Sequence, residues 1–280
     1  MTPRLARRTL AASAMLLPAA LIAPALAADV PDSTFERVRQ TRVLRIAALP
    51  GEAPYFFKDI VSGAWSGAAI EMAKSIAAVW DAKLEYVEST YGNSVLDLQS
   101  GKVDLAFALN PTPARALAIG FTHPMIVHPY GCLARHDLAP KTWGDINQPD
   151  LRVAFDIGSL HDTCAHRFTP RAQLLGFPNR DAATLALQSG RADVLIQAAV
   201  LGLASIGRNP SLGPYHLLTG PLVALPTDLG VRREADTRFV EVINAWLDYN
   251  RGIAQIREWM LEGLAKLGVQ PDQVAPEITF

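Results

Sequence analysis

The sequence predicts an α/β protein of two lobes, each a mostly parallel sheet flanked by helices, with two crossovers of the chain between the lobes. Two observations predict this class. Patterns typical of buried strands alternate with helical patterns along most of the chain, as in βαβ units. The segment Ser-Gly-Lys-Val-Asp-Leu at 100–105 returns as Ser-Gly-Arg-Ala-Asp-Val at 189–194, which indicates that one helix-to-strand unit occurs twice.

Composition excludes several classes of function. The chain has 280 residues, of which 50% are hydrophobic and 19% are charged, so it can bury a sizeable core. Its formal net charge is -1 and no basic stripe follows the first residues, so we expect no nucleic-acid partner. Beyond the N-terminal region no apolar run reaches about 18 residues, so we expect a soluble mature protein. We also expect a monomer.

The N-terminal segment has the pattern of a signal peptide. Arg4, Arg7 and Arg8 form a basic front, 10–26 is an apolar stretch interrupted by prolines, and small residues end at Ala27. We therefore expect a signal peptide at 1–27, cleaved after Ala27, and a periplasmic protein. The adjacent arginines leave the general and the twin-arginine export routes both open.

The first lobe is expected at 28–130 and 222–280. Alternating patterns give its elements in order: a strand at 42–49, a helix from Gly67 to Trp80, a strand at 84–87, a helix at 93–100, a strand at 103–109 and helices within 236–267. The segment 222–231 is expected to return the chain to this lobe. Gly101 and Gly268 are expected to end helices as C′ glycines, and the tail after Gly268 is expected to be poorly ordered.

The second lobe is expected at 131–221. The passage at 120–131, which is punctuated by proline and glycine, is expected to carry the chain into it. The elements of this lobe follow in order: a strand at 151–155, a helix start at 162–168, a helix at 182–190 and a strand at 191–196.

The chain has two cysteines, Cys132 and Cys164. In an exported protein such a pair predicts a disulfide, which would stabilise the fold by about 3 to 4 kcal/mol. The alternative is a metal site, because His136, His161 and His166 lie at close spacing to the cysteines. No recognised zinc pattern is present, so we expect no metal ion and no cofactor.

The segment from Tyr91 to Arg115 is the strongest indication of a binding site. A buried strand is followed by Asn110, Thr112 and Arg115, and open α/β sheets bind their ligands at the carboxyl ends of strands. Arginine offers a planar fork that suits a carboxylate. The alternative is a surface loop with a solvated arginine.

Several short segments together resemble a known family: exported solute-binding proteins of ABC importers, of the polar-amino-acid type, which have the two-lobe type II periplasmic-binding fold. The resemblance covers about residues 42–270. It rests on these segments in this order: Val43 to Ile46, Ala53 to Phe57, Glu71 to Lys74, Leu98 to Asp104, Thr112 to Arg115, Val153 to Ser159 and Ser189 to Asp193.

The resemblance implies a set of ligand-binding residues. In the family an aromatic residue stacks on the ligand, and a polar loop with an arginine binds its carboxylate. The end of a second-lobe helix supplies backbone amides. These roles correspond to the following positions here: Tyr91 for stacking, Asn110, Thr112 and Arg115 for the carboxylate, and Ser159, Leu160 and His161 for the amides.

The chain departs from the family pattern at three positions. The aspartate that pairs with the α-ammonium of an amino acid is replaced by Ala198, a first-lobe aromatic is replaced by Glu52, and a further aspartate is replaced by Ala69. Glu52 and Gln197 are candidate contacts for the other end of the ligand. The alternative for Glu52 is a solvated carboxylate at the lip of the site.

The resemblance implies a non-enzymatic protein that captures a small carboxylate-bearing solute, amino-acid-like or an organic acid, by hinge closure and delivers it to the permease of an ABC transporter. The alternative is an exported dehydratase-like enzyme on the same fold, acting on a cyclic carboxylate, with Glu52, Asp156, His161 or His128 as acid or base. No nucleophile elbow, phosphate loop or zinc-protease motif occurs, so no catalytic residue is predicted.

Overall fold

A computed structural model describes residues 33–274 and 276–280. The predicted signal peptide and its cleavage site lie outside these residues. None of the described helices is long and apolar enough to cross a membrane.

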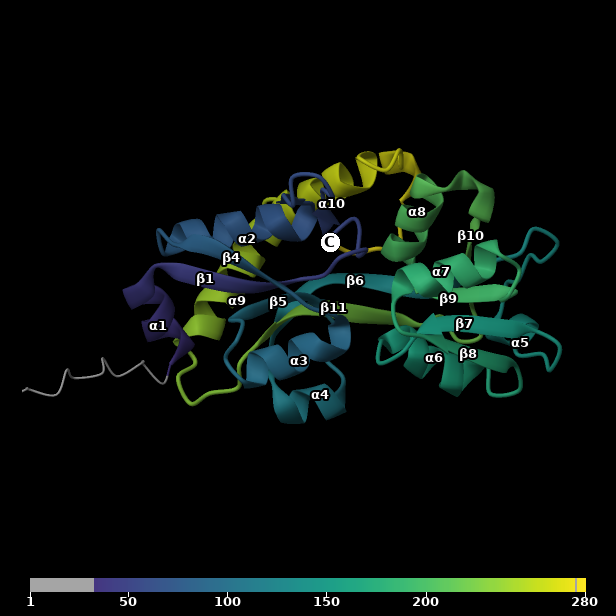
Figure 1. Cartoon of the computed structure of the whole chain (residues 1–280), viewed down its shortest axis with the longest axis horizontal. Helices are drawn as coiled ribbons and strands as arrows, with labels where there is room; N and C mark the ends of the chain where they lie inside the picture. Colours follow the sequence, from purple (N-terminus) through teal and green to yellow (C-terminus); the bar gives the residue numbers. More distant parts are fainter. Residues whose placement is uncertain (1–32, 275) are drawn as a thin grey trace, which may run out of the picture. The chain divides into compact units, whose positions relative to one another are not determined.

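The described chain is built on one large sheet that is flanked by helices (Figure 1). Its order is β4-β1-β5-β11-β6-β9-β7-β8, and β10 also pairs with β6. The strands are β1 (Val43–Ala48), β4 (Lys83–Glu88), β5 (Leu105–Leu109), β6 (Gly120–Ala134), β7 (Arg152–Asp156), β8 (Gln173–Phe177), β9 (Val194–Ala198), β10 (Tyr215–Leu217) and β11 (Ala224–Val231). A separate hairpin joins β2 (Phe57–Lys58) to β3 (Trp65–Ser66).

The pairing confirms two mostly parallel groups of strands. β1 is parallel to β4 and β5, and β7 is parallel to β8 and β9. Between the two groups, β6 and β11 run antiparallel to each other; β11 also pairs with β5 and β6 with β9. The two long strands are therefore the connection between the two parallel groups.

The helices of the described chain are α1 (Thr34–Thr41), α2 (Ala68–Val79), α3 (Tyr91–Gln99), α4 (Pro113–Ala118), α5 (Trp143–Ile146), α6 (Leu160–Phe168), α7 (Arg180–Gln188), α8 (Ala199–Arg208), α9 (Arg238–Gly252) and α10 (Gln255–Ala265). Six of these helices, α2, α3, α6, α7, α9 and α10, agree with the predicted ones to within a few residues, whereas α1, α4, α5 and α8 were not predicted. Two 3₁₀ turns are at Pro210–Leu212 and Pro271–Gln273. In Figure 1, α2 and α10 lie side by side, and these two helices contact each other.

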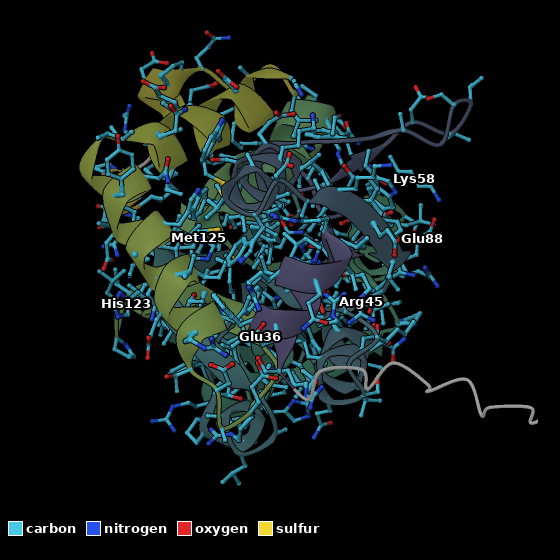
Figure 2. All side chains as sticks on the ribbon, turned by 90° about the vertical axis from the view of Figure 1, so that its left-hand side faces the viewer. Glu36, Arg45, Lys58, Glu88, His123 and Met125 are labelled. Carbon is cyan, nitrogen blue, oxygen red and sulfur yellow. The ribbon has the colours of Figure 1, made fainter. Side chains whose placement is uncertain are left out.

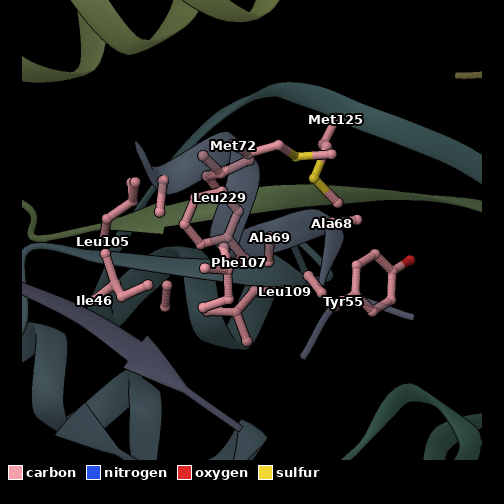
Figure 3. Close-up of a cluster of buried hydrophobic side chains, with 14 of the residues drawn as sticks. Ile46, Tyr55, Ala68, Ala69, Met72, Leu105, Phe107, Leu109, Met125 and Leu229 are labelled. Carbon is pink, nitrogen blue, oxygen red and sulfur yellow. The ribbon is translucent and has the colours of Figure 1, made fainter. Parts of the chain in front are cut away.

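The buried apolar side chains form separate clusters along the sheet. The largest draws on 38–126 and 229–278, together with the first half of α8. Two smaller clusters, which are built from 130–225, cover the β9-β7-β8 group of strands. Figure 3 shows part of the largest cluster, where Ile46, Leu105 and Phe107 pack together.

The repeated sequence segment has a structural explanation. Asp104 accepts hydrogen bonds from the backbone N–H and the guanidinium of Arg45 on β1, both over 2.7 Å. Asp193 accepts the same pair of bonds from Arg152 on β7, over 2.9 and 2.8 Å. In each group of strands the aspartate before one strand thus holds the arginine of the neighbouring strand. These charge-assisted bonds fix the register of the two strands.

Figure 2 shows the end of the sheet at which β1, β4 and α9 lie. Lys58 of β2 and Glu88 of β4 form an ion pair there, which ties the hairpin to the edge strand. On the other side, the backbone N–H of His123 donates to Asn244 of α9 over 2.8 Å. These contacts attach the hairpin and α9 to the sheet.

The passage at 120–131 is the first part of the long strand β6, although it contains Pro124 and Pro129. The register between β6 and β11 shifts near Asp228, which pairs with Pro124. The expectation of a poorly ordered tail was wrong, because Val127 and Thr279 exchange two backbone hydrogen bonds of 2.8 and 2.7 Å.

Candidate functional site

A cavity lies where the carboxyl ends of β5 and β7 approach the middle of β6. Its volume is about 20 Å³, room for about one water molecule, so its walls lie close together. It is lined by Tyr55, Tyr91, Ala108, Asn110, Arg115, His128, Tyr130, Ser159, Leu160, His161, Ala198, Leu201 and Thr227.

Arg115 bridges two loops at this cavity. Its Nη1 donates to the carbonyl of Asn110 over 3.2 Å, and its Nη2 donates to the carbonyl of Gly158 over 3.0 Å. The backbone around it is fixed by Thr112, the N-cap of α4, whose hydroxyl accepts from the Arg115 N–H. Burial lowers the pKa of Arg115 from its usual value, and it remains a cation at neutral pH. The guanidinium is therefore a positive charge at a half-buried position.

The start of α6 forms the opposite wall. Ser159 is its N-cap, and the Ser159 hydroxyl accepts from the N–H groups of His161 and Asp162. The N–H of Ser159 is bonded to the carbonyl of Asp156, so two of the three expected amides are used within the turn. Within 33–274, the structure gives the Leu160 N–H no hydrogen-bond partner. The helix end therefore offers one backbone amide toward an anion rather than three.

The two histidines that line the cavity are neutral. His161 accepts the N–H of Ala198 at Nε2 over 3.1 Å, so its proton is on Nδ1, which lies 3.1 Å from Asp156 Oδ1. Burial is the largest cause that lowers the pKa of His161, and burial lowers the pKa of His128 to about 3. Neither ring therefore adds a positive charge to the cavity near neutral pH.

Three tyrosines form much of the wall. The Tyr91 hydroxyl donates to Glu52 over 3.1 Å. Tyr130 packs between the rings of His128 and His161, with centroids 5.8 and 5.4 Å away. Tyr55 lies at the rim of the apolar cluster in Figure 3, with its hydroxyl directed away from the apolar side chains. Burial raises the pKa of Tyr55 and of Tyr130, so these phenols stay neutral.

A buried ion network stands behind the cavity wall. Arg180, the first residue of α7, donates to Asp156 over 2.8 Å, and its Nη2 lies 3.8 Å from Glu52. Burial raises the pKa of Glu52 to about 7, against the opposing effect of Arg180. The arginine holds the pKa of Asp156 well below its usual range, although burial alone would raise it. Asp156 therefore balances the charge of Arg180 at neutral pH.

The structure brings six of the nine predicted binding residues to the cavity: Tyr91, Asn110, Arg115, Ser159, Leu160 and His161. The other three do not line it. Glu52 stands behind Tyr91, Thr112 caps α4, and Gln197 is fully buried, with its Oε1 accepting from Ser205 over 3.1 Å.

Sequence reasoning missed several residues of the site. Tyr55 is in the apolar run Ala53 to Phe57, which looks like core, and Tyr130 is in the proline-rich passage that was not recognised as a strand. Arg180 follows a turn and carries no motif. The one available signal was its position at a helix start, where an arginine is unfavourable toward the helix dipole and needs another reason.

The predicted disulfide between Cys132 and Cys164 is wrong. Both cysteines are free, and both are buried in one apolar cluster, Cys132 on β6 and Cys164 on α6. Burial raises the pKa of both thiols, that of Cys164 to about 12. They pack as small apolar side chains. The described part of the chain also contains no group of three or more His, Cys, Asp or Glu side chains that could hold a metal ion.

A cavity between two parallel groups of strands, lined by aromatic rings and one arginine, defines a protein that binds a small solute. Residues 44–252 match the bacterial extracellular solute-binding proteins, family 3, and the chain belongs to this family. Its fold is the two-lobe α/β fold of the type II periplasmic-binding proteins.

Two curated relatives are similar over different lengths. The chain is 32% identical over 162 residues to the virulence sensor protein BvgS of Bordetella pertussis, a match that covers 54% of this chain and 12% of the sensor. It is 23% identical over 232 residues to cyclohexadienyl dehydratase of Pseudomonas aeruginosa, which covers 82% of this chain and 85% of the dehydratase.

Two solved structures have a similar fold. One is an ancestral amino acid-binding protein, a precursor of cyclohexadienyl dehydratase, with 25% identity, a TM-score of 0.72, and coverage of 82% of this chain and 98% of that one. The other is the substrate-binding protein of an amino acid ABC transporter from Streptococcus pneumoniae, bound to L-arginine. It has 20% identity, a TM-score of 0.76, and coverage of 83% of this chain and 98% of that one.

Proposed function

We propose that this protein is the exported substrate-binding component of an ABC importer, and that it captures a small carboxylate-bearing solute and delivers it to the membrane permease. The observation that carries the proposal is Arg115, a half-buried cation at a cavity of neutral side chains. A guanidinium binds a carboxylate through two parallel hydrogen bonds, and these bonds gain strength where water is excluded.

The present partners of Arg115 support this role. Both are backbone carbonyls, which a carboxylate can replace with stronger, charge-assisted bonds. The ring of Tyr91 and the free N–H of Leu160 would contact the same solute from two sides. The wall of the cavity would be formed in part by Asn110, Ser159 and His161. Three residues outside the lining would support this wall: Glu52, Thr112 and Gln197.

Hinge closure is the proposed mechanism of capture. The proposed lobes are 28–130 with 222–280, and 131–221. The two strands that connect them, β6 and β11, would provide the hinge, because they pair side by side between separate apolar clusters. A solute that touches both Arg115 and α6 would favour the closed state, since it gains contacts only there. The same proposal places the protein in the periplasm as a monomer, after cleavage behind Ala27.

The experiment is calorimetry and thermal shift on residues 28–280 with a panel of carboxylates, amines and sugars. A carboxylate at 100 times its Kd should stabilise the protein by about 2.7 kcal/mol. Arg115→Ala should remove the shift, whereas Arg171→Ala, at an exposed arginine of the proposed second lobe, should keep it. Retention of carboxylate binding by Arg115→Ala contradicts the proposal.

A second candidate is a dehydratase-like enzyme, which the similarity to cyclohexadienyl dehydratase over most of both chains favours. Glu52, with its pKa raised to about 7, has the protonation of a general acid. Its side chain is outside the cavity lining, however, and faces Tyr91 and Arg180. Mass spectrometry of each bound carboxylate after incubation separates the two candidates, because a binding protein returns it unchanged.

A further inference from the structure

We infer that the solute is an organic acid without an amino group, and that its second oxygen group is held by Tyr55 and His128. This inference rests on the proposed function and names the class of solute. It follows from two observations: the charges around the cavity, and two buried polar atoms that have no hydrogen-bond partner in the described chain.

The first observation concerns charge. Among the described residues that line the cavity, Arg115 has the one permanent charge, and none is an aspartate or a glutamate. An amino acid would bring an ammonium as well as a carboxylate. The ammonium would then lie in the same cavity as Arg115 with no anion beside it, which is unfavourable.

The nearby carboxylates are already engaged. Asp156 is bonded to Arg180 over 2.8 Å. Glu52 accepts the hydroxyl of Tyr91 and is not among the residues that line the cavity. At the end of β9, Ala198 has no side-chain acceptor, and its backbone N–H is bonded to His161. The charged side chains around the cavity therefore suit a solute with a net negative charge better than a zwitterion.

The second observation concerns donors. Tyr55 is 1% exposed and His128 is 2% exposed, and both line the cavity. Tyr55 Oη and His128 Nδ1 have no hydrogen-bond partner in the part of the chain that the structure describes. Buried polar groups in native proteins almost always have a partner, so two such atoms on one cavity indicate a partner that enters it.

The His128 atom is a donor. Its other ring nitrogen, Nε2, lies 3.1 Å from the hydroxyl oxygen of Thr227, which also accepts from Asn110 Nδ2 over 3.1 Å. The Thr227 hydroxyl proton has His128 Nε2 as its one acceptor among the described residues. The proton of the neutral imidazole is then on Nδ1. A phenol and an imidazole N–H together suit an oxygen acceptor.

The combined site therefore has two ends. Arg115 and the Leu160 N–H face a carboxylate, and Tyr55 with His128 face a second oxygen group. Oxo acids, hydroxy acids and dicarboxylates share this chemistry.

The test is calorimetry with matched solutes that differ in one group: 2-oxoglutarate against L-glutamate and glutarate, and phenylpyruvate against L-phenylalanine and 3-phenylpropionate. We expect at least one of the acids 2-oxoglutarate, glutarate and phenylpyruvate to bind at least tenfold more tightly than its amino-acid counterpart, which is L-glutamate for the first two and L-phenylalanine for the third. Equal or tighter binding of the amino acid overturns this inference and leaves the proposed function standing. Binding of no carboxylate, with a non-carboxylate hit from the wider panel, overturns both.

Tyr55→Phe tests the donor directly. Because the Tyr55 hydroxyl has no partner in the free protein, the variant should keep or raise the melting temperature. Its affinity for the tightest acid should fall at least fivefold, and Tyr249→Phe, at an exposed tyrosine, should leave that affinity unchanged. Unchanged affinity in Tyr55→Phe overturns the assignment of the second oxygen group.

Discussion

Arg180 donates a hydrogen bond of 2.8 Å to Asp156, and both side chains are almost completely buried. The same guanidinium nitrogen lies 3.8 Å from Glu52, on the loop after β1. The arginine thus joins β7 to a loop that belongs to the other parallel group of strands. Two of its nitrogens, Nε and Nη1, have no partner among the described residues.

Removal of Arg180 should be strongly destabilising. Arg180→Met leaves Asp156 buried without its cation, and breaking such a pair from one side costs about 3 to 5 kcal/mol of unfolding free energy. Urea unfolding followed by circular dichroism measures this loss. The matched control is Arg208→Met, because Arg208 pairs with Asp181 at the surface over 3.8 Å, and exposed pairs contribute at most about 1 kcal/mol. A similar small loss in both variants would show that the buried pair adds little.

The pH dependence of stability should depend on Glu52. Burial, only partly opposed by Arg180, raises the pKa of Glu52 from 4.5 to about 7 in the folded protein. A raised pKa means that the folded state resists ionisation. The contribution of Glu52 is then full below about pH 4.5 and is lost as the pH rises to about 7.

Glu52→Gln isolates this effect from the histidines, whose lowered pKa values act in the opposite direction at acid pH. The unfolding free energy of the wild type should fall relative to the variant by a few kcal/mol between pH 4.5 and 7, and the difference should be constant above that range. Glu262→Gln, at an exposed helical position, controls for the loss of a carboxyl group. A wild-type unfolding free energy that rises relative to that of the variant between pH 4.5 and 7 would refute the assignment.

Ala108 has a strained backbone at the cavity wall. Its φ is +60° within β5, in the left-handed region that side chains other than glycine avoid. Ala108→Gly should relieve about 1 kcal/mol of this strain, enough to offset the greater freedom of glycine in the unfolded chain. Ala106→Gly in the same strand has no such strain to relieve and should cost about 1 kcal/mol. Thermal unfolding of the two variants measures this difference. An equal loss of stability in both would mean that the strain at Ala108 is negligible.

Much of the fold could be predicted because the repeated unit is local. A window of about ten residues is enough to recognise the apolar period of a helix or strand and the glycine that follows it. The same holds for the positions of Asp104 and Asp193. The long strand β6 could not be predicted in this way, because its prolines are accommodated by a register shift against a strand about one hundred residues later.

The site could be predicted where a short segment matches the family pattern, as at Tyr91, at Asn110 with Arg115, and at Ser159 to His161. Asn110 and Arg115 follow a single strand, so the sequence indicates them together. Tyr55, His128 and Arg180 come from three distant segments, and their meaning depends on burial and on missing partners, which a sequence does not contain. The same limitation explains why the predicted disulfide was wrong. The expected export and the presence of two cysteines suggested a bridge, but the packing does not form it.

The cysteines give a last prediction. Cys132 and Cys164 are 0% and 3% exposed, so neither thiol should react with Ellman's reagent in the native protein, and both should react after denaturation in guanidinium. A reductant should leave the melting temperature unchanged within about 1 °C. A disulfide would instead contribute about 3 to 4 kcal/mol, and its reduction would lower the melting temperature by several degrees. Protein purified from the periplasm provides the strictest case, because an oxidising compartment favours any bridge that the geometry permits.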